Sequence, residues 1–424
     1  MHENEFPATD VVVVGARCAG AALAMLLARQ GHRVVVVDRA TFPSDTLSTH
    51  AIARGGVVQL ARWGLLDAVL DSGAPAIRRV RFHAGGDVVD RQIKGRSGVD
   101  LLVAPRRHVL DQLLVDAAIE AGAEVRTGVS VTGVTRHLGR VTGIVGHDAQ
   151  RETVRISARF VVGADGLRSR VAREVPAQVA VRRPPGGAAH YAYVARPDWD
   201  GFEFHIADRV MAGVFPTHGG EANVWVCGPG DHVERLRGDR PAGFLTLMAS
   251  ANPELAERVA AAGHTGPIRG VAGLPNHIRR AWGPGWALVG DAAMHRDPVT
   301  GHGITDAFRD AELMARTLDR VLRGEEAEAA AGRAYEARRH APLPAQFHAT
   351  APMSQHPPAD ESVAHQARRH GRVHEQFDAT VRMSQYPPVD EFVAQQRRST
   401  EAIEAEAQVL SELPAWPAPL VAAA

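Results

Sequence analysis

One stretch constrains the fold of this chain more than any other: DVVVVGARCAGAALAMLLARQGHRVVVVDR, residues 10–39. Two short apolar runs rich in β-branched residues, 11–14 and 34–37, are typical of buried parallel strands. Between them, residues 21–29 are strong helix formers with apolar spacing, and Gly31 ends the helix. Strand, helix and strand in this order form a βαβ unit, which predicts an α/β protein built on a parallel sheet.

The turn inside this unit carries a binding signal. Gly15 and Gly20 bound it, and such a turn brings backbone N–H groups and a helix N-terminus against a pyrophosphate. Asp38, at the tip of the second strand, is placed to accept hydrogen bonds from a ribose diol. The usual GxGxxG spacing is broken by Arg17, with the small Ala19 beside it. We predict a dinucleotide-binding turn in which Arg17 either faces phosphate or lies on the surface.

Length and charge narrow the class. With 424 residues, the chain exceeds what one core usually serves, so we expect two or three domains. Lys+Arg and Asp+Glu are 48 each, and this balance gives no indication of nucleic acid or an anionic membrane as a partner. Lys94 is the only lysine, which nearly excludes a lysine nucleophile or Schiff base.

The cysteines and the apolar runs indicate where in the cell the protein is expected. Cys18 and Cys227 have no CxxC partner, so we expect neither a disulfide framework nor a structural zinc, and we assign no residue to a metal. No uninterrupted apolar run reaches the ~18 residues that a membrane-spanning helix needs, and the first residues lack a signal pattern. We therefore expect a cytoplasmic protein without a membrane span.

Three further motifs follow in order along the chain. Arg107 begins a helix whose apolar residues fall on one face. A predicted strand ends at Asp165-Gly166, and another ends at Gly290-Asp291. Ten residues later, the turn Gly301-His302-Gly303 opens an amphipathic helix. The spacing places two acids at strand tips and two glycines at a helix start.

These motifs, in this order, resemble the class A FAD-dependent monooxygenases, which have the para-hydroxybenzoate hydroxylase fold within the glutathione-reductase-like FAD proteins. The resemblance covers about residues 8–325 and extends to the related geranylgeranyl reductase-like group. It implies FAD, with NADPH or NADH as a transient reductant and O2 as oxidant. It also implies a flavin C4a-hydroperoxide that passes one oxygen atom to a small organic substrate, aromatic, enolic or polyketide-like.

The resemblance also implies a set of site residues. FAD contacts are expected from Gly15, Arg17, Ala19, Gly20, Asp38, Arg39, Ser48, Arg107, Asp165, Asp291, Gly301, Gly303 and Ile304. In the family an acid at the position of Asp291 binds the ribitol chain of FAD. The helix start at Gly301-His302-Gly303 lies against the pyrimidine edge of the flavin. Met294, His302 and Thr305 replace the usual His, Gln and Asn, so side-chain roles at these positions are open.

Candidate catalytic residues are His50, Pro298 and His302. His50 ends the polar loop DTLSTH after the second strand, a loop that reaches the flavin in relatives. A histidine suits the ionisation of a phenol or enol near neutral pH. Pro298 would shape the wall where oxygen reacts, while His302 is as well explained as a helix-start residue.

The middle of the chain changes pattern to short, partly alternating segments that predict antiparallel strands. We expect a Rossmann-like FAD-binding domain, a discontinuous mixed or antiparallel substrate domain and a C-terminal helical extension. Their predicted bounds are 1–75, 96–175 and 271–330 for the first, 76–95 and 176–270 for the second, and 331–424 for the third. The extension contains a tandem duplication with a 30-residue offset, 346–369 and 376–399.

Other functions remain open from the sequence. A reductase of the geranylgeranyl type typically carries a cysteine in the loop where this chain has Ser48-Thr49-His50. A flavin halogenase would carry a WxWxIP motif and a catalytic lysine, which are not visible here. A non-catalytic ligand-binding flavoprotein is the third alternative, and both the substrate and a homodimeric state are undecided.

Overall fold

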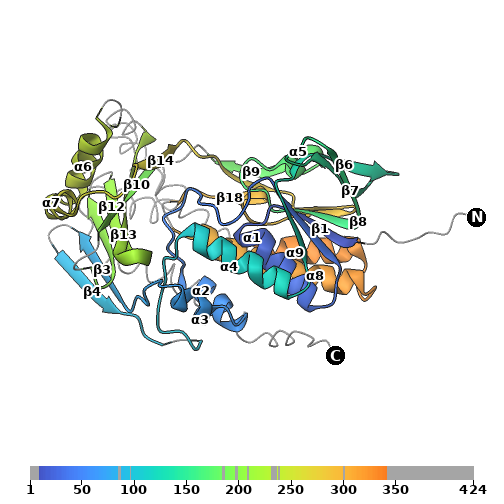
Figure 1. The fold of residues 1–424 in the computed structure, drawn as a ribbon, viewed down its shortest axis with the longest axis horizontal. Coiled ribbons are helices and arrows are strands. Elements are labelled where there is room, and N and C mark those ends of the chain that lie inside the picture. Colours follow the sequence, from blue (N-terminus) through green and yellow to red (C-terminus); the bar gives the residue numbers. More distant parts are fainter. Residues whose placement is uncertain are drawn as a thin grey trace, which may run out of the picture.

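The computed structural model describes residues 9–340, except 85–86, 96, 184–186, 196–198, 208–209, 231–235, 237–238 and 299–300. The duplicated segments 346–369 and 376–399 therefore lie outside the described residues. In the described part the chain forms an eight-stranded sheet, a seven-stranded sheet and a small three-stranded sheet (Figure 1). The predicted α/β class with a second, mainly antiparallel sheet is confirmed.

The eight-stranded sheet is parallel at its centre. Its strand order is β16-β17-β8-β1-β2-β5, and β7 and β6 extend from β8 in antiparallel pairing. The bounds are β1 Thr9–Val14, β2 Val34–Asp38, β5 Glu124–Thr127, β6 Ser130–His137, β7 Arg140–His147, β8 Thr153–Gly163, β16 Trp282–Gly283 and β17 Trp286–Leu288. The register sets Val14 beside Val37 and Gly163, and Gly163 beside Leu288. Three sequence-distant strands thus end at one edge, next to β2.

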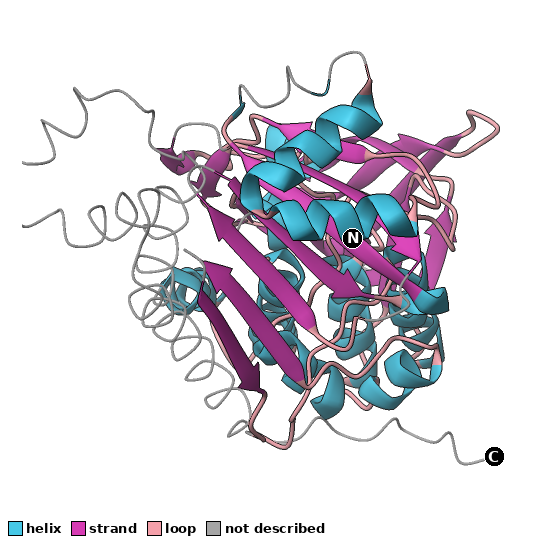
Figure 2. Ribbon diagram, turned by 90° about the vertical axis from the view of Figure 1, so that its left-hand side faces the viewer, coloured by secondary structure: helices cyan, strands magenta, loops and turns pink. Residues whose placement is uncertain are grey.

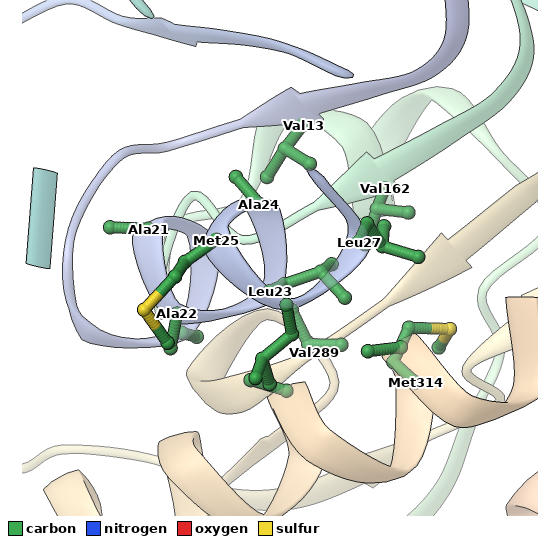
Figure 3. Packing of buried hydrophobic residues seen from close by; sticks show 14 of the residues in the cluster. Val13, Ala21, Ala22, Leu23, Ala24, Met25, Leu27, Val162, Val289 and Met314 are labelled. Atoms are coloured by element: carbon green, nitrogen blue, oxygen red, sulfur yellow. The ribbon is translucent and has the colours of Figure 1, made fainter. Parts of the chain in front are cut away.

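Helices cover one face of this sheet (Figure 1). They are α1 Cys18–Arg29, α4 Arg107–Glu120, α8 Gly303–Leu322 and α9 Glu328–His340. Helices α2 Arg54–Arg62 and α3 Leu66–Asp71 pack against α8 and α4, and α5 is the short helix Arg170–Glu174. Helix α1 is buried from Cys18 to Ala28, because it packs between the sheet and helices α4 and α8. Its alanines let these neighbours approach closely, and Figure 3 shows Leu23, Met25 and Met314 filling the remaining space with Val13 and Val162.

The seven-stranded sheet has the order β14-β10-β13-β12-β11-β3-β4. Its strands are β3 Arg79–Ala84, β4 Asp87–Gln92, β10 Ala188–Ala195, β11 Phe202–Ala207, β12 Val210–Pro216, β13 Glu221–Gly228 and β14 Arg269–Ala272. The sheet is discontinuous in sequence, as predicted. Figure 2, viewed from the outer side, shows α6 Arg240–Ala251 and α7 Pro253–Ala262 lying across it. The inner face is turned toward the loops of the parallel sheet.

A three-stranded sheet of β9 Val179–Arg183, β15 Asn276–Arg279 and β18 Met294–His295 lies between the two larger sheets. It carries the chain from the second sheet back to the strand-tip acid at Asp291. Among the described residues, no helix combines the length and the apolar character required to cross a membrane.

Candidate active site

The glycine turn after β1 is shaped by close contacts. Gly15 has a φ of +104°, and a Cβ placed there would lie 2.4 Å from the carbonyl oxygen of Ala164. A Cβ at Gly20 would lie 1.8 Å from the Gly15 oxygen, so α1 approaches the turn as only a glycine allows. The Asp38 carboxylate accepts hydrogen bonds from the backbone N–H groups of Ala16 (2.7 Å) and Ala40 (2.8 Å). Asp38 therefore fixes the turn from the neighbouring strand.

Arg17 and Arg107, both predicted from sequence, converge on one buried carboxylate. Asp111 is fully buried and accepts from Arg17 Nη1 at 2.7 Å and from both Nε (3.1 Å) and Nη2 (3.0 Å) of Arg107. Cys18 Sγ lies 3.2 Å from the same carboxylate. The Arg17 guanidinium also bonds the backbone oxygen and side chain of Ser44. The arginine that breaks the glycine spacing is thus held in place by ion pairing.

The acid after β8 has a local task. Asp165 accepts hydrogen bonds from the Ser169 hydroxyl and from the backbone N–H groups that open α5. Burial raises the pKa of Asp165, and those hydrogen bonds oppose the rise. Gly166 follows with a φ of +74°, which lets the chain turn sharply there.

Asp291, the acid after β17, is exposed although its neighbours Gly290 and Ala292 are buried. Burial among protein atoms raises the pKa of Asp291, His295 and Arg107 oppose that rise, and the nearby carboxylates of Asp306 and Asp310 add to it. Asp291 therefore presents a carboxyl group at the edge where Gly15 and Asp38 lie.

The two helix starts at this edge have no side-chain caps. Neither Arg17, before α1, nor His302, before α8, makes a capping hydrogen bond to its helix. Gly301 has a φ of +66°, and a Cβ at Gly301 or Gly303 would meet nothing within 4 Å. Pro298 closes the turn by accepting from Gly301 N–H at 2.9 Å. Helix starts without a side-chain cap, with their partial positive charge, suit an anion at α1 and an electron-rich ring at α8.

His50 lies in the loop after β2, against strand β10 of the seven-stranded sheet. It is 1% exposed and has a left-handed backbone with a φ of +70°. Its Nε2 shares a short hydrogen bond with the Tyr193 hydroxyl of β10, and the two rings stack with centroids 5.7 Å apart. The Arg106 guanidinium lies over the Tyr193 ring, 3.7 Å from the ring centroid. Nδ1 of His50 has no partner among the described residues.

The charge state of this dyad follows from its surroundings. Burial lowers the pKa of His50 well below 6.5, and the positive charges of Arg107 and Arg106 lower it further. Burial also raises the pKa of Tyr193, partly offset by Arg106. Both side chains are therefore neutral at neutral pH, and the dyad sits in a positive field.

Aromatic side chains line the inner face of the seven-stranded sheet beside the dyad. They form one buried cluster that includes Tyr191, Phe202, Phe215 and Trp225. Phe215 and Trp225 lie 5.3 Å apart, and Phe202 and Phe215 lie 4.5 Å apart, between ring centroids. This cluster gives the inner face of the sheet a closely packed, apolar surface beside the dyad.

The remaining predicted residues lie around these features. Ser48 accepts from His50 N–H at 3.0 Å, Arg39 is exposed, and Ala19 and Ile304 are buried at the starts of α1 and α8. His205 of β11 is not part of this region, since it lies on the outer face of the seven-stranded sheet, where it contacts Glu203.

The fold and this geometry agree with a comparison against known families. The FAD binding domain family matches residues 8–347. The chain belongs to this family. It is an FAD-dependent oxidoreductase.

Individual relatives of this flavoprotein differ in what they are named for. It is 30% identical over 328 residues to "Menaquinone reductase" of Mycolicibacterium smegmatis, covering 73% of this chain and 76% of the relative. It is 30% identical over 321 residues to "Digeranylgeranylglycerophospholipid reductase 1" of Methanopyrus kandleri, covering 70% and 77%. Its fold matches PqsL of Pseudomonas aeruginosa, "a probable FAD-dependent monooxygenase", with a TM-score of 0.70 and 24% identity over 82% of this chain and 95% of that one.

Two residues of this flavoprotein's site were not predicted from the sequence. Asp111 had one signal, its i+4 spacing from Arg107, which predicts an ion pair on a helix. Tyr193 had none, because 143 residues separate it from His50 and only the folded sheet brings them together.

Proposed function

We propose that this flavoprotein is a monooxygenase that uses NAD(P)H and O2 to oxygenate a small aromatic, enolic or polyketide-like substrate. The overall reaction consumes one NAD(P)H, one O2 and one proton, and it leaves one oxygen atom in the product and one in water. The observation that carries the proposal is the neutral His50–Tyr193 dyad, buried in a positive field beside an aromatic cluster.

The glycine turn, the acids and the helix starts at the strand-tip edge have an arrangement that suits FAD. The uncapped start of α1 and the glycine turn would hold the pyrophosphate, with Arg17 and Arg107 adding positive charge. Asp38 would meet the adenosine ribose and Asp291 the ribitol chain. The uncapped start of α8, with Gly301, Gly303 and Ile304, would lie against the flavin ring. The remaining predicted contacts are Ala19, Gly20, Arg39, Ser48 and Asp165.

When bound, FAD supplies a two-electron carrier that reacts with O2. The residues of this chain act on the substrate. The positive charges of Arg106 and Arg107 that disfavour a protonated His50 would favour an ionised phenol or enol at the same place. His50 would orient the substrate oxygen through Nδ1, and Tyr193 would fix the orientation of the imidazole.

A prenyl-chain or quinone reductase is the second candidate, and one observation favours it. The two curated relatives described above, each 30% identical, are named as reductases of such molecules. Against it stands the loop after β2, which has no cysteine. Both cysteines lie elsewhere, in α1 and β13, and burial raises the pKa of each thiol.

One experiment separates the candidates, a non-catalytic binding protein included. The FAD-loaded protein is reduced anaerobically with NADPH or NADH and then mixed with O2 and a panel of phenols, polyketide-like enols and prenylated quinones. A product heavier by one oxygen atom, formed faster by wild type than by His50→Gln, supports the monooxygenase. A product heavier by two hydrogens, formed without O2, supports the reductase. Absence of turnover with every compound would leave the binding protein as the better account.

A further inference from the structure

A second group of ionisable side chains lies on the outer face of the seven-stranded sheet, away from the candidate active site. Strands β3 and β11 pair in parallel, and the register sets His83 directly beside His205. Side chains alternate along a strand, so Glu203 shares the face of His205, while Phe202 and Phe204 point to the inner aromatic cluster. Figure 1 shows β3 at the far side of this sheet from β1 and β8.

The three side chains are close enough to act together. The imidazole rings of His83 and His205 stack with centroids 4.1 Å apart and an angle of 15° between their planes. His205 Nε2 lies 3.4 Å from Glu203 Oε2. One donor atom from each of the three residues lies within 4.8 Å of the other two. His205 and Glu203 are 2% and 1% exposed, and His83 is half-buried.

Buried nitrogens in this group lack partners. Among the described residues, His83 Nε2 and His205 Nδ1 have no hydrogen-bond partner although both atoms are buried. A buried polar atom without a partner is unfavourable, and native proteins leave few of them. The lone pair of such an unpartnered imidazole nitrogen is available to bind a cation.

Two neighbouring arginines fix the orientation of the Glu203 carboxylate. Arg258 Nη1 lies 3.0 Å from Glu203 Oε2, and Arg81 Nη1 lies 3.3 Å from Oε1. Arg258 Nη2 and His205 Nε2 also lie 3.5 Å and 3.4 Å from this carboxylate, so a bound ion replaces the weakest of four contacts. Carboxylates that bind metals are commonly hydrogen-bonded by an outer layer of side chains. Asp90 and Asp200 pair with Arg81, so the arginine charge is itself balanced.

The protonation states suit a cation. Burial raises the pKa of Glu203, but His205 and Arg258 outweigh it and lower that pKa to about 2. Burial and the neighbouring His205 lower the pKa of His83 below its usual value. Glu203 is therefore an anion and His83 a neutral ring at neutral pH, and metal ligands must be in these deprotonated forms.

We propose that His83, Glu203 and His205 bind a divalent transition-metal ion, such as Zn²⁺, that joins β3 to β11. Two imidazoles and one carboxylate suit Zn²⁺, Co²⁺ or Ni²⁺ better than Mg²⁺ or Ca²⁺, which prefer oxygen ligands. Tetrahedral zinc needs ligand atoms roughly 3.3 Å apart, so the rings tilt toward each other on binding. The ion replaces a stacked pair of imidazoles, each with one unpartnered nitrogen, by a side-chain link between two paired strands that are distant in sequence. Water completes its coordination.

The test uses the full-length, FAD-loaded protein without a histidine tag, cleared of metal with a chelator. Zn²⁺ and Co²⁺ are then titrated, bound metal per chain is counted by mass spectrometry, and the visible spectrum of bound Co²⁺ reports its geometry. We expect one ion per chain in wild type and loss of that ion, with at least tenfold weaker affinity, in His83→Gln and Glu203→Gln. His137→Gln, an exposed histidine of β6, is the matched control and should bind as wild type does.

Thermal unfolding gives a second reading, since a ligand that binds only the folded state raises the melting temperature. Zn²⁺ should raise it in wild type and in His137→Gln but not in the two ligand variants, and Mg²⁺ should have no effect. Because His83 is half-buried and Glu203→Gln keeps the side-chain volume, at least one variant should fold, as far-UV circular dichroism and bound FAD will show. Binding of less than one ion in wild type, or equal binding by all variants, overturns the proposal.

Discussion

Replacing Asp111 tests whether two arginines of the FAD site depend on one buried carboxylate. The side chain of Arg107 is 11% exposed and that of Arg17 28%, and both point at the fully buried Asp111. Removing one partner of a buried ion pair costs about 3–5 kcal/mol, because the remaining charge is left uncompensated. The share of Arg17 is smaller, since water screens it. We therefore expect Asp111→Ala to destabilise the FAD-free protein by about 3 kcal/mol.

The assay is thermal unfolding of FAD-free protein, together with FAD affinity from flavin fluorescence. A loss of this size should lower the melting temperature by on the order of 5 °C. Asp116→Ala is the matched control, because Asp116 lies on the same helix and is exposed. Removing both charges, as Arg107→Met with Asp111→Leu, should be less destabilising than Asp111→Ala alone. The reasoning fails if Asp111→Ala has the same melting temperature as Asp116→Ala. It also fails if the double variant has the lowest melting temperature of all.

Three further predictions concern buried charge and backbone conformation elsewhere in the described structure. Since the folded protein holds His50 neutral and the unfolded chain protonates it near pH 6.5, stability is lost as pH falls below that value, by up to about 1.4 kcal/mol at pH 5.5; His50→Gln should flatten the melting temperature measured between pH 7.5 and 5.5. Arg339 of α9 is fully buried and pairs with a buried carboxylate at 2.9 Å, so Arg339→Met should cost about 2–4 kcal/mol in chemical denaturation, whereas the exposed Arg338→Met should cost little. Gly301→Val strains a backbone with a φ of +66° and adds a side chain at the start of α8, so FAD should dissociate at least about tenfold more readily, whereas Gly324→Val, with a φ of +77° at the far end of α8, should keep its FAD.

The parallel sheet could be predicted because its signals are local. The apolar runs before Gly15 and Asp38 lie within 30 residues of each other, and the helix between them is read from residue types alone. The motifs along the chain predicted that Asp165 and Asp291 each follow a strand, as they do in the structure, but not the order of those strands in the sheet. What the sequence could not give is which residues the folded strands bring together. Arg17 lies 94 residues before Asp111, and no periodicity links them.

The outer-face group illustrates the same limit more sharply. His83 and His205 are separated by 122 positions, in segments that each predict an ordinary strand. Only the parallel register between β3 and β11 places the rings side by side. A pattern of histidines in one sequence cannot report register, because a shift of one residue would send each ring to the opposite face.

The choice between oxygenation and reduction turns on proton supply. Saturating a carbon–carbon double bond requires an acid that can deliver a proton to carbon. His50 is held neutral by a pKa far below 6.5, and burial raises the pKa of Tyr193, so neither is a ready acid at neutral pH. Burial raises the pKa of both thiols as well.

Oxygenation of a phenol or enol has the opposite need, an environment that draws the proton off the substrate and stabilises the anion. The positive field of Arg106 and Arg107 meets that need, so replacing Arg106 by Met should raise the pH at which a phenolic substrate ionises when bound. If an absorbance titration of the bound phenol finds no such rise, the electrostatic reason for preferring oxygenation falls, and the reductase becomes the stronger candidate.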